Sequence, residues 1–326
     1  MRGVVQTWVM KRIAFTYPGQ GSQVPGMGKD AAQARPDLSR SYYEAADDIL
    51  GLPLSRICFE GDAEQLRDTA VTQPAIFLTS LVFTRLLEEQ GVVPDVVAGH
   101  SLGEYAALVT AGVLDWTDAL RLVRRRGELM AAVNRRTPGR MAAVLDLGAD
   151  QIDELCAEVT RQGRGTVEVA NYNSAAQTVV SGDARGVEEF AAAARRAGAQ
   201  RVVDLKVGAP FHSVFMKEIE AEFADDLAGV RFAEPALPVV ANATAGYVET
   251  AEAARELLRR QLASPVLWTQ TVELLVAAEV SALLEVGPGR VLSNIARASA
   301  PGLPALPVGT MRQLGKAVAQ VSAVTV

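Results

Sequence analysis

Residues 92–114, VVPDVVAGHSLGEYAALVTAGVL, decide the fold class of this 326-residue chain. The apolar run 92–98 has the length of a buried strand, and the residues from 104 onward have the composition of a helix. Between them, GHSLG at 99–103 matches G-x-S-x-G, a tight strand-to-helix turn that lifts a serine hydroxyl out of a sheet. The stretch therefore predicts an α/β fold with Ser101 as a nucleophile.

A second glycine-rich turn points to the same edge of the predicted sheet. The apolar run 13–17 is followed directly by PGQGSQ at 18–23. Along the rest of the chain, strand-length apolar runs alternate with helical patterns, which is typical of a mainly parallel sheet. Ligands gather at the carboxyl ends of such strands, so we expect both turns to face one crevice.

One internal stretch has its own order of elements. We expect strands at 141–147, 167–171, 177–181 and 201–207, and helices at 150–161 and 184–197. The order β-α-β-β-α-β is that of a ferredoxin-like fold. The sequence therefore predicts a large α/β-hydrolase-like domain at 12–136 and 208–310, an inserted ferredoxin-like small subdomain at 137–207, and terminal extensions at 1–11 and 311–326. We expect the substrate site in the cleft between the two parts.

Composition and charge exclude several classes of protein. The net charge is −6, and no Lys/Arg run suggests the concentrated basic face that nucleic acid needs. Cys58 and Cys156 lie far apart without metal-ligand spacing, which predicts a reduced, cytoplasmic setting and no metal site. No segment is expected to reach the length of a membrane span.

A nucleophilic serine needs a base, and the chain has only 2 histidines. His100 directly precedes Ser101 on the tight turn, so we expect its side chain to diverge from the hydroxyl and to pack or cap instead. By elimination, His212 in GAPFHS is the predicted base. For the oxyanion, elbow enzymes use the backbone N–H after the nucleophile, here Leu102, and a second from an early glycine-rich loop. Gln20 is the predicted second donor, although PGQGSQ taken alone also fits an ordinary turn.

A buried cation is predicted in the helix expected at 116–134. Ala119, Leu122, Val123 and Met130 form one apolar stripe at helical spacing, and Arg126 lies in the middle of it. A guanidinium on a buried face needs an anion, and its planar fork suits a carboxylate. Two anions remain open: the carboxylate of a substrate, or an Asp or Glu in an internal salt bridge. We expect Arg124 and Arg125 to point to water.

The chain resembles the malonyl-coenzyme A:acyl carrier protein transacylase family over residues 12–310. The resemblance depends on nine segments in family order: FTYPGQGSQ, TQPAIF, GHSLGEYAAL, RLVRRRGELM, MAAV, NYNSAAQTVVSG, APFHSVFM, RQLASPVLW and EVGPGRVL. It implies that Ser101 is acylated, that His212 is the base, and that the backbone amides of Gln20 and Leu102 bind the oxyanion.

The same resemblance implies roles for residues around the acyl group. Arg126 would hold a malonyl carboxylate, and the main-chain carbonyl of Gln261 would orient the histidine. Leu102 and Phe211 match the pattern for malonyl, since a bulky Phe would crowd an α-methyl group. The positions that would line the acyl pocket are Gln73, Met130, Asn171 and Asn173; for the two asparagines and Gln73, ordinary strand-end and turn roles remain open.

The implied reaction is a ping-pong transfer from malonyl-coenzyme A to the phosphopantetheine thiol of an acyl carrier protein, a transient, acidic partner. It needs no metal and no redox cofactor, and we expect a monomer that binds neither nucleic acid nor membrane. Three alternatives stay open: transfer of another extender or acyl chain, thioester hydrolysis on the same scaffold, and a silent scaffold protein. Arg126 argues against a hydrolase for uncharged chains, and the intact serine and histidine argue against a scaffold.

Overall fold

Five parallel strands form the sheet that carries the serine turn. The computed structural model describes residues 12–205, 207 and 209–324, and within them the strand order is β7-β2-β1-β8-β9. Tyr17 of β1 pairs with Gly99 of β2, so the two glycine-rich turns leave the sheet side by side. This architecture confirms the predicted α/β fold class with a parallel sheet. The strands are β1 Arg12–Tyr17, β2 Val96–Gly99, β7 Val239–Val240, β8 Val280–Val286 and β9 Ala305–Val308.

The strand before the serine is shorter than predicted. It begins at Val96 rather than at residue 92, because Pro94 has no N–H to donate to a sheet ladder. Asp95 marks the entry: its carboxylate accepts the Ile13 N–H at 2.7 Å. The chain therefore enters the sheet only after the proline.

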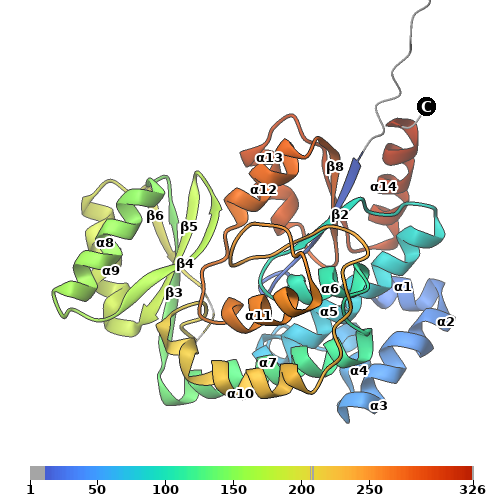
Figure 1. The fold of residues 1–326 in the computed structure, drawn as a ribbon, viewed down its shortest axis with the longest axis horizontal. Coiled ribbons are helices and arrows are strands. Elements are labelled where there is room, and N and C mark those ends of the chain that lie inside the picture. Colours follow the sequence, from blue (N-terminus) through green and yellow to red (C-terminus); the bar gives the residue numbers. More distant parts are fainter. Residues whose placement is uncertain (1–11, 206, 208, 325–326) are drawn as a thin grey trace, which may run out of the picture.

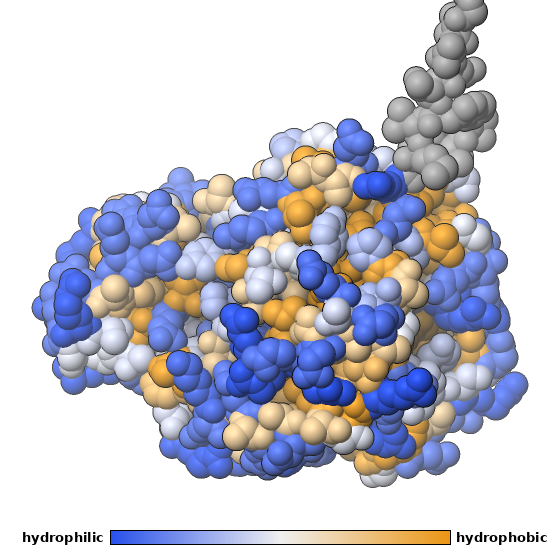
Figure 2. Space-filling view, in the orientation of Figure 1, coloured by the Kyte–Doolittle hydropathy of each residue, from blue (hydrophilic) through white to orange (hydrophobic). Residues whose placement is uncertain are grey.

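A smaller antiparallel sheet lies at one end of the molecule, on the left in Figure 1, away from the parallel sheet. Its strand order is β4-β5-β3-β6, with helices α8 and α9 side by side on its outer face, as in a ferredoxin-like fold. Figure 2 shows mainly hydrophilic side chains over these helices, whose apolar stripes face the sheet through Ile152 and Phe190. The elements are β3 Gly139–Leu145, α8 Ala149–Arg161, β4 Val167–Ser174, β5 Gln177–Asp183, α9 Ala184–Arg196 and β6 Arg201–Asp204. The last strand, expected to reach 207, ends at Asp204.

One helix passes the usual length and hydropathy test for a membrane span. The helix α5, Thr69–Glu89, contains an 18-residue window of mean hydropathy 1.4, so the expectation that no segment reaches this length was wrong. That window is 94% buried inside the protein, however, and α5 packs against α7, Trp116–Arg136, in the centre of the large domain. Its apolar composition is that of a core helix surrounded by other elements.

The C-terminal stretch is part of the large domain. We expected 311–326 as an extension, but residues 311–324 form the helix α14, Met311–Val324, which packs on β9 and α5. Leu314 and Ala317 are buried there, and their burial explains why this segment folds with the domain. The predicted extension at 1–11 lies outside the described residues.

The other helices complete the layers around the parallel sheet (Figure 1). They are α1 Lys29–Ala34, α2 Pro36–Leu38, a π-helix Ser39–Glu44, α3 Ala45–Leu50, α4 Leu54–Glu60, a 3₁₀ turn Gln65–Arg67, α6 Gly103–Thr110, a 3₁₀ turn Val214–Met216, α10 Lys217–Ala228, α11 Ala251–Gln261, α12 Trp268–Ala277 and α13 Val291–Ser299.

Candidate active site

Ser101 stands on a strained turn between β2 and α6. Its φ of 51° lies in the left-handed region, which costs a non-glycine residue about 1–2 kcal/mol. Asn242, just after β7, holds the turn from below: its Oδ1 accepts the Ser101 N–H at 2.6 Å, and its Nδ2 donates to the Gly99 carbonyl at 2.5 Å. A Cβ on Gly103 would overlap the Tyr17 carbonyl, so this position needs glycine.

His212 lies beside the serine hydroxyl. Its Nε2 is 2.7 Å from Ser101 Oγ, and its Nδ1 lies 3.0 Å and 3.1 Å from the carbonyl oxygens of Gln261 and Ser264. Carbonyl oxygens only accept, so Nδ1 carries the proton and Nε2 is free to accept one from the serine. Burial, and next the Arg126 charge, lower the pKa of His212 to about 3, which keeps the imidazole neutral at ordinary pH.

His100 diverges from the hydroxyl. Its Nε2 is 2.9 Å from Asn173 Oδ1 in the small sheet, and its ring lies 5.4 Å, centroid to centroid, from Trp268. Burial lowers the pKa of His100 as well. This imidazole therefore connects the serine turn to the small subdomain.

Arg126 is aimed at the serine from the middle of α7. Its side chain is only 1% exposed, and Nη2 donates to Ser101 Oγ and to Gln261 Oε1, both at 3.0 Å. Nη1 donates to Gln73 Oε1 at 2.7 Å. Among the residues that the structure describes, Arg126 forms no ion pair, and its Nε has no hydrogen-bond partner. Within the described part of the chain, Arg126 thus does not form the internal salt bridge that was the alternative.

The two neighbouring arginines differ from the prediction. We expected Arg124 and Arg125 to point to water, but both are partly covered and paired with acids. Arg124 lies 2.7 Å from Glu128, and Arg125 contacts Glu222 and Asp226 of α10. Arg125 thus connects α7 to α10, and Arg124 Nη1 donates to the Ala70 carbonyl in α5 at 2.8 Å, while Arg126 faces in.

The predicted oxyanion donors lie in the two adjacent turns, Gln20 after β1 and Leu102 after β2. Gly19 touches the other turn, since a Cβ there would be 2.7 Å from the His100 carbonyl oxygen. Within the described chain, neither the Gln20 N–H nor the Leu102 N–H donates a hydrogen bond to the protein. The Gln20 side chain donates instead to Thr69 Oγ1 at 3.1 Å.

The other predicted residues are buried around these groups. Gln73 accepts from the Arg126 guanidinium through Oε1, and its Nε2 lies 3.4 Å from Met130 Sδ. Phe211 directly precedes the histidine and is 6% exposed. Asn171 pairs its backbone with Val266 of the large domain, and Asn173 donates to Gln177 while it holds His100. The asparagines thus lie where the small sheet contacts loops of the large domain.

Sequence reasoning missed three residues of this cluster, namely Glu104, Asn242 and Ser264. Glu104 lies in the GHSLGE segment itself, and its position on a buried helix face was a signal of the same kind as Arg126. Burial raises the pKa of Glu104 to about 7, while hydrogen bonds from Gln261 and Asn242 and the Arg126 charge oppose the shift. Asn242 and Ser264 had no comparable signal, since they contribute through loop positions set by the fold.

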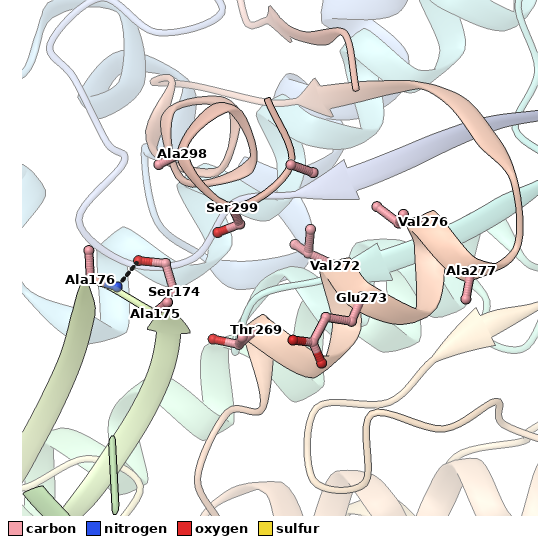
Figure 3. Close-up of a pocket in the computed structure, with 11 residues that line it drawn as sticks. Ser174, Ala175, Ala176, Thr269, Val272, Glu273, Val276, Ala277, Ala298 and Ser299 are labelled. Atoms are coloured by element: carbon pink, nitrogen blue, oxygen red, sulfur yellow. Dashed lines mark hydrogen bonds between the residues drawn. The ribbon is translucent and has the colours of Figure 1, made fainter. Parts of the chain in front are cut away.

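Within the described residues, no group of three or more His, Cys, Asp or Glu side chains is placed to hold a metal ion. A cavity of about 480 Å³ lies between the β4–β5 turn and helices α12 and α13, lined among others by Ala176, Thr269 and Glu273 (Figure 3). None of the predicted site residues lines it, so it is separate from the serine site.

A neutral imidazole poised on a serine hydroxyl, in a turn at the edge of a parallel sheet, supports chemistry through a seryl ester. Fold and site together define a serine-dependent enzyme of the α/β-hydrolase-like class. The chain belongs to the acyl transferase domain family, whose model matches residues 14–322. This confirms the family that the sequence motifs predicted.

Known proteins of similar sequence and structure agree with this assignment. The chain is 40% identical over 288 residues to the malonyl CoA-acyl carrier protein transacylase of Bacillus subtilis (strain 168), covering 88% of this chain and 90% of the relative. It is 40% identical over 289 residues to the enzyme of that name from Escherichia coli (strain K12), covering 88% and 93%.

Solved structures give the same result. A type II polyketide acyl-carrier protein in complex with its malonyl-transacylase matches with a TM-score of 0.91 at 39% identity, covering 95% of this chain and 100% of the other. FabD from Acinetobacter baumannii matches with a TM-score of 0.91 at 36% identity, covering 96% and 99%.

Proposed function

We propose that this enzyme transfers a malonyl group from coenzyme A to the phosphopantetheine thiol of an acyl carrier protein. One observation carries the choice of acyl group: the buried Arg126 guanidinium lies 3.0 Å from Ser101 Oγ and has no carboxylate partner among the described residues. A cation in this position stabilises an acyl chain that ends in a carboxylate. The relatives named malonyl transacylases support the same choice.

The first half of the reaction acylates the serine. Ser101 Oγ attacks the thioester carbonyl while His212 Nε2 takes its proton, and the negative charge moves onto the carbonyl oxygen. In this proposal the N–H groups of Gln20 and Leu102 hold that oxyanion. The carbon–sulfur bond then breaks, the histidine returns the proton to the leaving thiolate, and coenzyme A departs with malonyl left on Ser101.

The second half runs the same steps in reverse. The carrier's thiol gives its proton to His212 and attacks the seryl ester, and Ser101 leaves as the restored hydroxyl. The carbonyl groups of Gln261 and Ser264 keep Nδ1 protonated, so Nε2 stays available in both halves. These steps require no metal or redox cofactor.

The remaining residues shape the acyl pocket in this proposal. Gln73 and the Gln261 side chain fix the fork of Arg126, and Met130 and Phe211 bound the space beside it. Asn171 and Asn173 close it from the small subdomain, 137–207, which we propose as a unit inserted into the large domain, 12–136 and 208–324. We also propose a monomer that acts in the cytoplasm, where the buried free cysteines Cys58 and Cys156 stay reduced.

A panel of acyl-coenzyme A donors tests the function directly. The purified protein is mixed with malonyl-, methylmalonyl-, acetyl- or butyryl-coenzyme A, and the adduct on Ser101 is read by intact-protein mass spectrometry. We expect rapid malonyl loading, no adduct on Ser101→Ala, and transfer to added carrier protein. Free malonate as the main product with carrier in excess would show a hydrolase instead, and faster loading from neutral donors would contradict the choice of acyl group.

A further inference from the structure

Glu104 is a buried carboxyl group that the mechanism above does not use. It lies on α6, three residues after Ser101, and is 1% exposed. Within the described part of the chain it forms no ion pair, although a buried carboxyl normally has one. Its Oε2 instead accepts two hydrogen bonds, from Gln261 Nε2 at 2.7 Å and from the Asn242 N–H at 3.1 Å.

Gln261 links Glu104 to Arg126. Its side-chain amide donates through Nε2 to Glu104 and to the Ser101 carbonyl, the latter at 2.9 Å, and accepts from Arg126 through Oε1. The two acceptors on the Nε2 side fix which end of the amide faces α6. The oxygen end must then face the guanidinium, which places Arg126 Nη2 next to Ser101.

The other acceptor contact leads to the nucleophile. Glu104 holds the backbone of Asn242, and the Asn242 side chain holds the Ser101 N–H and the Gly99 carbonyl. One carboxyl oxygen therefore supports both the residue that aims Arg126 and the residue that clamps the serine turn. Removing it leaves two buried N–H groups without an acceptor.

We propose that Glu104 is a positioning residue that orients the Gln261 amide, and through it Arg126, so that Ser101 accepts a carboxylated acyl group. The inference rests on the proposed malonyl transfer. A purely structural carboxyl would contribute to stability and would treat all acyl donors alike, whereas a residue that aims Arg126 affects carboxylated donors selectively.

The test compares malonyl and acetyl loading of Ser101 in single-turnover experiments. Glu104→Ala should lower the malonyl rate about tenfold or more, the size expected when a buried hydrogen-bonded group loses its partner, and should lower the acetyl rate less than about threefold. Glu104→Gln keeps an oxygen at the same place and should restore most of the malonyl preference. Glu104→Asp withdraws the oxygen by one methylene and should lose the preference in the same direction, should the alanine variant fail to fold.

Glu285 provides the matched control. It is also fully buried, and it accepts the Leu292 and Ser293 N–H groups at the start of α13, without contact to Ser101, Arg126 or His212. Glu285→Ala should lower the melting temperature and leave the ratio of malonyl to acetyl loading unchanged.

The outcomes separate this inference from the function on which it rests. If wild-type protein does not prefer malonyl, the proposed function fails. If wild-type protein prefers malonyl and folded Glu104→Ala or Glu104→Asp keeps the same ratio, or loses both rates equally, only the positioning role is overturned. A lower ratio in these variants, restored by Glu104→Gln and absent in Glu285→Ala, supports it.

Discussion

At the scale of single residues, the site depends on one buried cation surrounded by neutral partners. Arg126 donates to Gln73, Gln261 and Ser101, none of which carries a negative charge. Burial lowers the pKa of Arg126, and the nearby Tyr105 and Glu104 oppose this shift. Because none of these partners is a carboxylate, the guanidinium can still form a charge-assisted pair with a carboxylated ligand.

Replacing Arg126 tests whether its charge serves the substrate. Arg126→Ala should slow malonyl loading about 100-fold, as loss of a charged, buried hydrogen bond of about 3 kcal/mol implies, and should slow acetyl loading less than about tenfold. Arg124→Ala removes a neighbouring arginine that pairs with Glu128 and should leave both rates within about twofold. Rapid-quench kinetics with both donors measure this, and equal losses for malonyl and acetyl would show that Arg126 is structural.

The histidine predicts an unusual pH dependence. Because burial and Arg126 lower the pKa of His212 to about 3, the base stays neutral as the pH falls from 8 to 5. Protonation of His212 should therefore give the acylation rate of the free enzyme no acid limb near pH 6.5, the ordinary value for histidine. The same shift has a stability consequence: the folded pKa lies below the unfolded one, so the contribution of His212 is complete above about pH 6.5 and is lost as the pH falls toward 3.

Stopped-flow kcat/KM profiles for Ser101 acylation check this expectation. Glu104, whose pKa burial raises to about 7, titrates in the same window, so the profile is repeated with Glu104→Gln. A midpoint near 6.5 that persists in that variant would mean that His212 titrates normally.

At the scale of elements, the serine turn requires three chain segments to approach closely. Ser101 and His212 both have positive φ, 51° and 55°, although neither is a glycine. Such strain persists only when the surroundings hold it, and here Asn242 supplies two hydrogen bonds to the turn. Gly103 lets α6 begin directly against the end of β1.

A methyl group at that contact should disrupt the turn. Gly103→Ala places a Cβ on the Tyr17 carbonyl, so α6 must move away from β1, at a cost of about 2 kcal/mol or more in the free energy of unfolding. Ser101 loading should fall at least tenfold. Gly148→Ala is the control, since a Cβ there meets nothing within 4 Å. Urea denaturation and loading kinetics of both variants test this expectation. If Gly103→Ala keeps the stability and the loading rate of the wild type, the turn tolerates the displacement.

At the scale of the whole molecule, the core of the large domain reaches to the end of the described chain. The helix α5 is buried because α7 and α14 cover it, and Leu314 of α14 is only 5% exposed. An apolar helix of this length would otherwise expose a continuous hydrophobic face. The C-terminal helix is therefore part of the hydrophobic core of the large domain.

Two substitutions in α14 measure that contribution. Leu314→Ala should lower the free energy of unfolding by about 2–3 kcal/mol, the usual cost of truncating a buried leucine. Lys316→Ala, on the exposed side of the same helix, should change it by less than about 0.5 kcal/mol. Chemical denaturation compares the two, and equal stabilities would mean that α14 adds no burial energy.

Local patterns in the sequence predicted most of the elements and the candidate catalytic pair, Ser101 and His212. Strand-length apolar runs, the spacing of G-x-S-x-G and the stripe around Arg126 depend on residues close together in the chain, so periodicity and turn chemistry reveal them. Because the chain has only 2 histidines, elimination alone selected His212 as the candidate base. The start of β2 was missed where Pro94 interrupts an apolar run, and α14 was missed because its burial depends on α5.

Only the tertiary structure decided how these groups are held. The Ser101 N–H is bound by a side chain 141 residues away, and Glu104 reaches Gln261 across 157 residues. No local pattern encodes such contacts, because they depend on which loops the parallel sheet brings to one edge. The same holds for the partners of Arg126. The sequence predicted a buried cation and left an internal carboxylate open as its partner. The fold instead places the amides of Gln73 and Gln261 and the Ser101 hydroxyl around it.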